Sequence, residues 1–224
     1  MTLTLYHCRD ARSLRPLWVL EELGLDYALV PMEFPPRLRH EGYLDINPLG
    51  TVPTLLDGEL RLTESVGICQ YLVQRYGPHP LAVAADEPGY GDWLNWLHRS
   101  DSTLTFPLTL ILRYGRYEPP ERRLGQVVDD YTQWFLSRLR SVEAGLQGRE
   151  HLCAGRFTAA DICVGYAVYL ARLLGLGYKF GPATAAWLER ITARPAFLRC
   201  LERQAHLEPA LEARDGPPAP GSKP

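Results

Sequence analysis

The sequence lacks any long apolar stretch. Its longest clean apolar run, residues 162–171, is about half of the roughly 18 residues that a membrane-spanning helix requires, so we expect no such helix. Basic residues are not in surplus, because 24 Lys and Arg stand against 26 Asp and Glu, and the net charge of −2 argues against a nucleic-acid-binding protein. The first residues, MTLTLYHCRDARS, contain no basic segment followed by an apolar one, and we therefore expect no signal peptide.

Cysteines are few, and their spacing carries no metal or disulfide signature. There are five, an odd number, and no two of them form a CxxC pair. The pattern predicts no metal centre and suits a reducing cytoplasm. The five are Cys8, Cys69, Cys153, Cys163 and Cys200.

The first part of the chain alternates strand and helix patterns. Residues 2–7 and 26–32 are rich in β-formers and predict strands, and residues 13–23 between them predict a helix with Ser13 as its N-cap. A strand, a helix and a strand within about 30 residues have the length of a βαβ unit with parallel strands.

A hairpin and a second helix follow. Residues 53–57 and 60–62 flank an Asp-Gly pair, which is a strong hairpin signal between apolar runs. Residues 64–76 then predict a helix that a Gly- and Pro-containing segment ends. Residues 34–50, before the hairpin, predict irregular structure or short helices.

From about residue 88 the pattern becomes helical. Apolar residues recur at steps of three or four over residues 121–147, which predicts a long amphipathic helix. The other helical stretches are residues 89–112, 158–174, 183–193 and 196–206. We expect an α/β domain followed by an all-α domain, divided as residues 1–79, a linker 80–87, a helical domain 88–211 and a disordered tail 212–224.

Residues 47–55, NPLGTVPTL, place a proline at the start of a predicted strand. If the bond between Val52 and Pro53 is cis, it turns the backbone of Val52 outward, where its N–H and C=O can pair with an extended peptide ligand. The alternative is an ordinary loop proline, since only about 5–6% of such bonds in folded proteins are cis.

Residues 62–65, Leu-Thr-Glu-Ser, lie where a loop meets a helix. Ser65 and the free backbone N–H groups there can hold a carboxylate, and Glu64 beside them can pair with an ammonium. Together they suit the zwitterionic head of an amino acid. The alternative is a plain helix N-terminus with an acidic first turn.

Taken together, these motifs favour a ligand-binding site over an ordinary loop proline and a plain helix N-terminus. NPLGxVPxL, an Asp-Gly hairpin and L-x-E-S at a helix start closely resemble the thioredoxin-like domain of glutathione transferases. Residues 157–162, FTAADI, give Thr158 as N-cap and Asp161 at N3, a capping box with a hydrophobic staple that is similar to a structural mark of the family's helical domain. The resemblance covers about residues 2–205. It implies a thioredoxin-like domain followed by a C-terminal helical bundle.

The resemblance implies a glutathione site. Pro53 matches the family's cis-proline, and Val52 matches the residue whose backbone pairs with the cysteinyl part of glutathione. Glu64 and Ser65 match the residues that hold the γ-glutamyl head. In relatives an acidic residue of the partner subunit also reaches the γ-glutamyl amine, and Asp101 is the best match for it.

The glycyl carboxylate of glutathione is implied to lie near residues 36–46. Three side chains in that stretch are candidates to help there, namely Arg37, Arg39 and His40.

The resemblance leaves open which residue stabilises the glutathione thiolate. Relatives often carry Ser or Cys a few residues before the position of Arg15, where this sequence has Ala11 and Arg12. Ser13 is the only hydroxyl in this turn, and it either donates to the thiolate or only caps the helix. Arg12 is the second catalytic candidate, through its charge.

Two further residues lie near this turn. Tyr6 ends the first strand, near the catalytic phenol of tyrosine-type transferases, and packing is its alternative role. Cys8 with a lowered pKa would form a mixed disulfide with glutathione, which is reductase chemistry.

The implied function is that of a glutathione S-transferase that joins the glutathione thiolate to a small hydrophobic electrophile in a cleft between the domains. Glutathione is a cosubstrate, and no metal or nucleotide cofactor is implied. Relatives are usually homodimers. The alternatives are a glutathione-dependent disulfide or peroxide reductase, and a non-catalytic binding or regulatory protein. The Val52–Pro53 and Glu64–Ser65 pairs oppose the last, because a protein without a peptide ligand needs neither.

Overall fold

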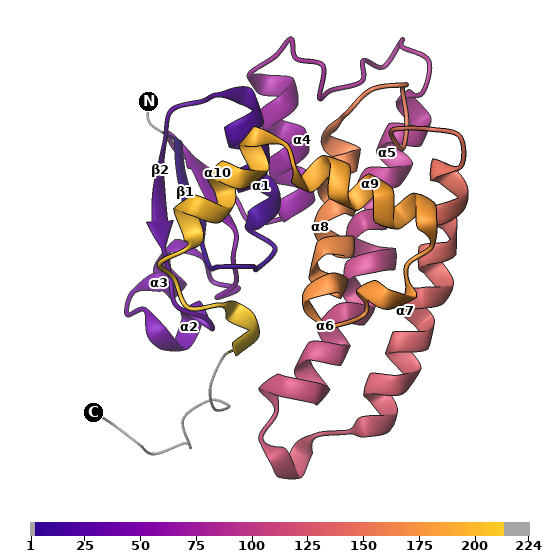
Figure 1. Cartoon of the computed structure of the whole chain (residues 1–224). Coiled ribbons are helices and arrows are strands. Elements are labelled where there is room, and N and C mark those ends of the chain that lie inside the picture. Colours follow the sequence, from indigo (N-terminus) through magenta and orange to yellow (C-terminus); the bar gives the residue numbers. More distant parts are fainter. Residues whose placement is uncertain (1–2, 213–224) are drawn as a thin grey trace.

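The computed structural model describes residues 3–212, which form an α/β part followed by a helical part (Figure 1). The elements of the α/β part are β1 (Leu3–His7), α1 (Leu14–Leu23), β2 (Tyr27–Pro31), α2 (Pro36–Arg39), α3 (Tyr43–Ile46), β3 (Thr54–Asp57), β4 (Leu60–Leu62) and α4 (Ser65–Arg75). The four strands form one sheet in the order β2-β1-β3-β4, in which β1 and β2 are parallel and the other pairs antiparallel. The predicted βαβ unit and hairpin are confirmed.

The helical part begins after α4. Its elements are α5 (Tyr90–Arg99), η1 (Ser100–Thr105), α6 (Phe106–Leu112), η2 (Arg113–Tyr117), η3 (Pro120–Arg122), α7 (Gly125–Leu146), α8 (Ala159–Leu173), η4 (Gly177–Lys179), α9 (Pro182–Thr192), α10 (Pro195–Gln204) and η5 (Ala210–Glu212). The predicted order of an α/β domain and an all-α domain is confirmed. Within residues 3–212 no helix combines the length and the apolar character needed to cross a membrane.

The helix predicted over residues 89–112 is not regular. The π-helical segments η1 and η2 lie on either side of α6. Pro107 has no N–H to donate to the carbonyl of Thr103 four residues earlier, and it is the second residue of α6, directly after η1. The periodicity of apolar residues does not reveal a change from α-helical to π-helical turns, because the same face of the helix stays buried.

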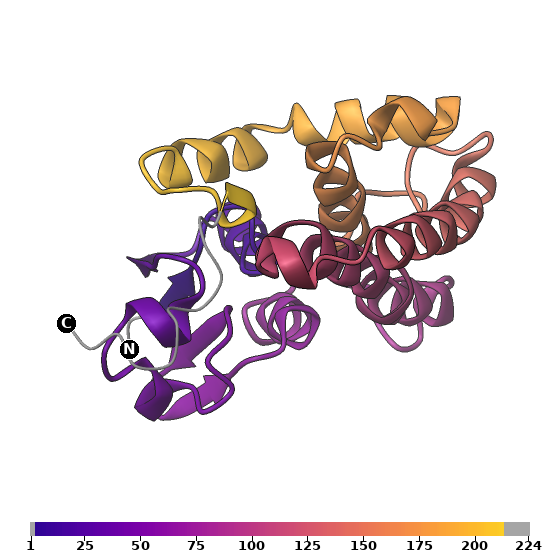
Figure 2. The ribbon, with the colours of Figure 1, turned by 90° about the horizontal axis from the view of Figure 1, so that it is seen from below.

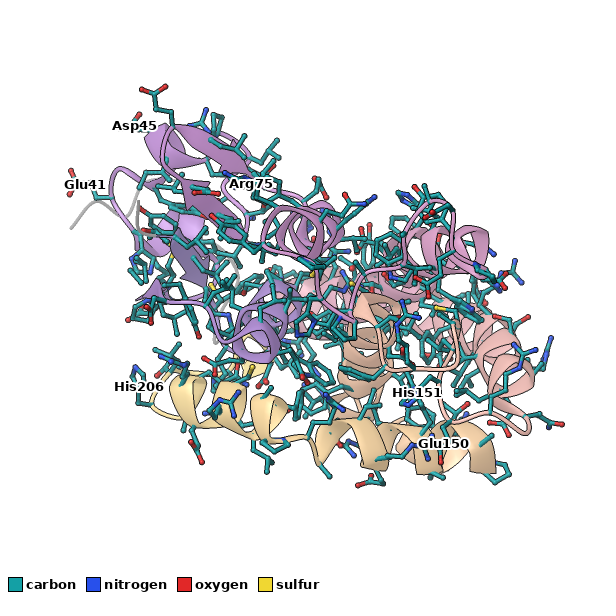
Figure 3. All side chains as sticks on the ribbon, turned by 90° about the horizontal axis from the view of Figure 1, so that it is seen from above. Glu41, Asp45, Arg75, Glu150, His151 and His206 are labelled. Atoms are coloured by element: carbon teal, nitrogen blue, oxygen red, sulfur yellow. The ribbon has the colours of Figure 1, made fainter. Side chains whose placement is uncertain are left out.

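Helix α1 joins the two parts of the molecule. All residues from Leu14 to Glu21 are buried, and α1 packs against α4, α8 and α10. The ring of Trp18 lies 6.0 Å from that of Phe157 and 4.6 Å from that of Phe197. One hydrophobic core therefore continues from the sheet into the helical part, and side chains fill the space between their ribbons (Figure 3).

Helix α8 starts with the predicted capping box. The side chain of Thr158 accepts from the N–H of Ala160 at 3.2 Å, and the carboxylate of Asp161 accepts from the N–H of Thr158 at 2.9 Å. Asp161 also accepts from the indole N–H of Trp187 at 3.1 Å, so the cap ties α9 to α8. The predicted capping box is confirmed.

The C-terminal helix α10 returns across the α/β part beside α1 (Figure 2). Arg194 donates to both carboxylate oxygens of Glu22, at 2.6 and 2.8 Å. Arg199 and Arg203 reach the carboxylate of Glu21, at 2.7 and 2.5 Å. These ion pairs fix α10 against α1.

Replacing Glu21 by glutamine is expected to lower the free energy of unfolding by about 1.5–3 kcal/mol near neutral pH, the usual value for hydrogen bonds to a charged group. Burial raises the pKa of Glu21, but the hydrogen bonds from Tyr27 and Arg199 and the charge of Arg203 outweigh it, so the pKa is lowered from 4.5. The stabilisation is therefore complete above that pH and is lost as the pH falls through the folded-state pKa. Urea unfolding at pH values on both sides should show the difference from wild type shrinking in acid; a constant difference would contradict this account.

The predicted linker, residues 80–87, lies between α4 and α5, and we propose domains at 1–79 and 88–211 on that ground. The guanidinium of Arg156, from the loop before α8, donates to the carbonyls of Pro80 and Ala82 in the linker, at 2.9 and 2.8 Å. Except for Glu212, the tail predicted to be disordered lies outside the described residues.

Candidate glutathione site

A cavity of about 510 Å³ is lined by residues of both parts of the molecule. One wall comes from the loop after β1, from α2 and from the segment before Pro53. The opposite wall comes from η1, α6, η2, η3 and α8, and η5 contributes the last lining residues. The cavity is therefore in the predicted place, between the two domains.

The peptide bond between Val52 and Pro53 is cis, as the resemblance implied. Val52 lines the cavity, and within the described part of the chain its N–H and C=O make no hydrogen bond. The carbonyl of Thr51 before it is fixed by Tyr43 at 2.6 Å and Asn47 at 2.8 Å. A free backbone donor and acceptor on a fixed segment suit pairing with an extended peptide.

The hydroxyl of Ser13 lies in the interior and does not line the cavity. It accepts from the N–H of Cys8 at 3.2 Å and donates to the carbonyl of Cys8 at 3.3 Å. Ser13 occupies the N-cap position of α1 as predicted, but its side chain makes no capping hydrogen bond, because the hydroxyl closes the loop after β1 instead. The same contacts keep it away from a thiol in the cavity, so the geometry does not support Ser13 as the thiolate donor.

Arg12, the second catalytic candidate, does line the cavity. Its Nη2 donates to Thr109 Oγ1 at 2.9 Å, and its Nε lies 3.3 Å from Asp101 Oδ1. That Nε is shielded from solvent and makes no hydrogen bond among the described residues. The guanidinium is thus held in place by Thr109 and Asp101, while its Nη1 makes no hydrogen bond among the described residues, and such a fixed cation can stabilise a thiolate.

Arg15 connects this cation to the predicted γ-glutamyl site. It is fully buried, and its Nη1 donates to Ser65 Oγ at 2.9 Å and to Asp101 Oδ1 at 2.8 Å. Burial raises the pKa of Asp101, but the charges of Arg15 and Arg12 outweigh it and the pKa is lowered. Two arginines therefore share one carboxylate, which leaves a positive charge beside Ser65.

The remaining contacts of the Arg15 guanidinium lead into the helical part. Its Nη2 donates to the carbonyl of Ser100 at 3.0 Å and to Thr105 Oγ1 at 2.6 Å, and its Nε donates to the carbonyl of Cys163 at 3.2 Å. No role was predicted for Arg15 from the sequence. The sequence does contain a signal for such a role, which is that Arg15 is a single arginine within the apolar stretch LRPLWVL. An arginine in such a stretch needs either solvent or several hydrogen-bond acceptors.

Ser65 and Glu64 lie at the start of α4, as predicted. Because Ser65 Oγ accepts from Arg15, its own proton is available for another acceptor. The first intrahelical bond runs from the N–H of Ile68 to the carbonyl of Glu64, so the N–H groups of the first turn have no partner within the helix. Neither predicted residue lines the cavity. Ser65 is connected to the cavity through Arg15, Asp101 and Arg12, the last of which lines it.

Of the other predicted binding residues, some line the cavity and others do not. Arg37 and Arg39 of α2 line the cavity, whereas the side chain of His40 accepts from the N–H of Glu33 at 2.7 Å. Asp101 lies in η1 beside arginines of its own chain. Its contact with glutathione in a partner subunit stays a prediction.

Cys8 and Tyr6 do not have the surroundings of reactive groups. Burial raises the pKa of Cys8 to about 12, and the side chain is 1% exposed. A thiol with that pKa is protonated near neutral pH and is a poor nucleophile. The ring of Tyr6 packs against that of Tyr43, with centroids 5.7 Å apart, in agreement with the packing role.

The end of the chain contributes to the cavity, which the sequence did not predict. Gln204 donates to Asp10 Oδ1 at 2.8 Å, and its carbonyl oxygen accepts from the N–H of Asp10 at 3.2 Å. The N–H of Ala210 donates to the carbonyl of Arg9 at 3.0 Å. Asp10, Ala210 and Leu211 then line the cavity together. No local pattern indicates these contacts, because the partners are about 190 residues or more apart.

Comparisons with known proteins identify the family. The family model for the N-terminal domain of glutathione S-transferases matches residues 1–74. Glutathione S-transferase 3 of Zea mays is 30% identical over 80% of this chain and 83% of its own length, and glutathione S-transferase 4 of Zea mays is 30% identical over 81% and 83%. The structure of the glutathione transferase URE2P6 from Phanerochaete chrysosporium, in complex with oxidized glutathione, superimposes with a TM-score of 0.81 at 27% identity and covers 92% of this chain and 98% of its own. The domain model, the relatives over most of their length and the shared fold confirm the resemblance: the chain belongs to the glutathione S-transferase family of enzymes.

Proposed function

We propose that this protein conjugates glutathione to a small hydrophobic electrophile. The thiolate sulfur attacks the electrophilic carbon and forms a C–S bond, while the leaving group, such as chloride, departs with the electrons of the bond that breaks. The thiol proton passes to solvent. Glutathione is consumed as a cosubstrate, and the proposed step uses no metal or nucleotide.

The observation that carries the proposal is the position of Arg12 in the same cavity as Val52. If the backbone of Val52 pairs with the cysteinyl part of glutathione, the sulfur is directed into the cavity that the Arg12 guanidinium lines. Arg39 of α2 provides a cation for the glycyl carboxylate. Ser65 and Glu64, at the start of α4, provide the hydroxyl, N–H groups and carboxylate for the γ-glutamyl head.

Two alternatives have less support. Disulfide reduction through a mixed disulfide with the protein needs a reactive cysteine, and all five cysteines are buried, with Cys8 as the one near the predicted site. A non-catalytic glutathione-binding protein has no need of a cation such as Arg12 in the cavity where the sulfur is expected. Turnover, rather than binding, separates this last alternative from the proposal.

We further propose a cytoplasmic homodimer. The five free cysteines suit a reducing compartment. Phe106 and Trp134 are 52% and 51% exposed, and the ring of Trp134 stacks on that of Tyr131 with centroids 5.8 Å apart. Exposed aromatic surface of this kind suits an interface with a second copy. Sedimentation equilibrium measures the mass in solution.

The experiment that tests the proposed activity is a conjugation assay with chlorodinitrobenzene and glutathione. We expect a rate above the uncatalysed one that saturates with glutathione. Arg140→Gln, an exposed change on α7, is the control and should keep this rate. Glutathione binding without turnover of aryl chlorides, enones or epoxides would contradict the proposal and support the non-catalytic alternative.

A further inference from the structure

A second group of charged residues lies on the helical side of the cavity. Glu118 accepts from Arg113 Nε at 2.9 Å through Oε1, and its Oε2 lies 3.3 Å from Arg122 Nε. All three residues line the cavity. The Glu118 carboxylate is 11% exposed, whereas the side chains of Arg113 and Arg122 are 55% and 67% exposed. One shielded carboxylate therefore holds two accessible guanidinium groups in neighbouring positions.

The two arginines use only one edge of each guanidinium for this contact. Both approach Glu118 with Nε, and among the hydrogen bonds of residues 3–212 their terminal nitrogens have no partner. A guanidinium has five N–H donors, so most of the donors of Arg113 and Arg122 remain available. Two such groups beside each other match the two oxygens of a carboxylate, which arginine binds with paired hydrogen bonds.

The turn that carries these residues is fixed independently of any ligand. The N–H of Glu118 donates to the carbonyl of Arg113 at 2.8 Å. Arg123 donates to the carbonyl of Glu118 at 3.0 Å and to that of Arg116 at 3.1 Å. Because the turn is already ordered, a ligand that binds there does not have to order it.

The cavity as a whole has an excess of positive charge. Five arginines line it against two carboxylic acids, although the net charge of the chain is −2. Arg12 is the candidate for the thiolate, and Arg37 and Arg39 lie on α2, where the glycyl carboxylate is expected. Arg113 and Arg122 come from the helical domain and are not needed for glutathione.

The surface between these arginines and Arg12 is largely apolar. The ring of Phe34 lies 5.2 Å from that of Tyr117, and Leu112, Leu170 and Leu211 line the cavity with them. A ligand that fills this space therefore has an apolar, preferably aromatic, body. Its end at Arg113 and Arg122 has to satisfy cationic donors.

We propose that Arg113 and Arg122 recognise a carboxylate on the electrophilic cosubstrate, so that the preferred acceptor is an aromatic acid rather than a neutral compound. This inference rests on the proposed conjugation activity and names the substrate class of the same site. The step itself is unchanged, since the C–S bond forms as the leaving group departs with its electron pair.

The test compares chlorodinitrobenzoate with its methyl ester as acceptors, each enzymatic rate being divided by the uncatalysed rate with glutathione. We expect the wild-type protein to prefer the acid about tenfold in kcat/KM, the equivalent of about 1.4 kcal/mol. The double variant Arg113→Gln/Arg122→Gln is expected to lose this preference while it keeps its rate with the ester. Arg140→Gln removes a comparable charge on α7, away from the cavity, and should retain the preference. Added salt should weaken it, because exposed charges are screened.

Three results would overturn the inference. The first is an equal response of acid and ester to the double substitution, and the second is a wild-type preference for the ester. The third is a raised KM for glutathione, measured with the ester, in the double variant, because the two arginines would then serve glutathione itself. If neither acceptor is converted, the proposed conjugation activity fails together with this inference, whereas conversion of the ester without a preference for the acid contradicts only this inference.

Discussion

Replacing Arg15 by methionine is expected to lower the free energy of unfolding by about 3–5 kcal/mol, the cost of breaking a buried charged network by removing one partner. The substitution leaves the hydroxyl of Thr105 without its donor and removes one of the donors to the carbonyls of Ser100 and Cys163 in the interior. It also leaves Asp101 with only the more distant Arg12. Equilibrium urea unfolding measures the loss, and glutathione affinity should fall as well, because Ser65 is no longer fixed.

Two variants make this expectation specific. Arg15→Lys keeps the charge but cannot make the same set of contacts, because an ammonium lacks the planar fork of the guanidinium. It should therefore fall between wild type and the methionine variant. Arg12→Met removes a partly exposed arginine that also contacts Asp101, and it should cost much less stability. Equal effects of Arg15→Met and Arg12→Met would show that the buried network does not hold the two domains together.

Replacing Arg12 by alanine is expected to lower kcat/KM for conjugation by about a hundredfold, the usual loss when one fixed donor to a developing anion is removed. The cation favours the thiolate over the thiol, so without it the pKa of bound glutathione should rise toward the free value of about 8.5. The acidic limb of the pH–rate profile should then move to higher pH. The ultraviolet absorbance of the thiolate, titrated in the binary complex, measures the same change directly.

The matched comparisons for Arg12 are Arg12→Lys and Ser13→Ala. Lysine keeps a positive charge near the sulfur and should restore part of the rate. Ser13→Ala should leave the thiol pKa unchanged, because that hydroxyl is bonded to Cys8 in the interior. If Ser13→Ala shifted the pH profile and Arg12→Ala did not, the assignment of the two residues would have to be reversed.

Most of the fold could be predicted from local patterns. Strand alternation, the Asp-Gly turn and the spacing of apolar residues are read over short windows, and the capping box at Thr158 and Asp161 needs only four residues. These features are local, so the sequence reports them. The cis bond before Pro53 is different, because the residues alone left an ordinary loop proline as the alternative and only the resemblance to glutathione transferases implied the cis form.

The contacts that were not predicted join residues that lie far apart in the chain. Arg15 meets Asp101 across 86 positions, and Gln204 meets Asp10 across 194. Ser13 and Arg12 are neighbours in one turn, and only the path of the loop after β1 decides which side chain faces the cavity. The sequence pattern does not contain the path of that loop, so it cannot tell which of the two side chains faces the cavity.

The most direct test of the glutathione site is calorimetric titration of glutathione into the wild-type protein and into Ser65→Ala, with Ser102→Ala as the control. Ser102 is an exposed serine whose hydroxyl donates to the carbonyl of His98, and its loss should leave binding unchanged. The account predicts saturable binding by the wild type and an affinity at least tenfold lower in Ser65→Ala, about 1.4 kcal/mol. Absence of wild-type binding at millimolar glutathione, or equal binding by Ser65→Ala, would contradict it.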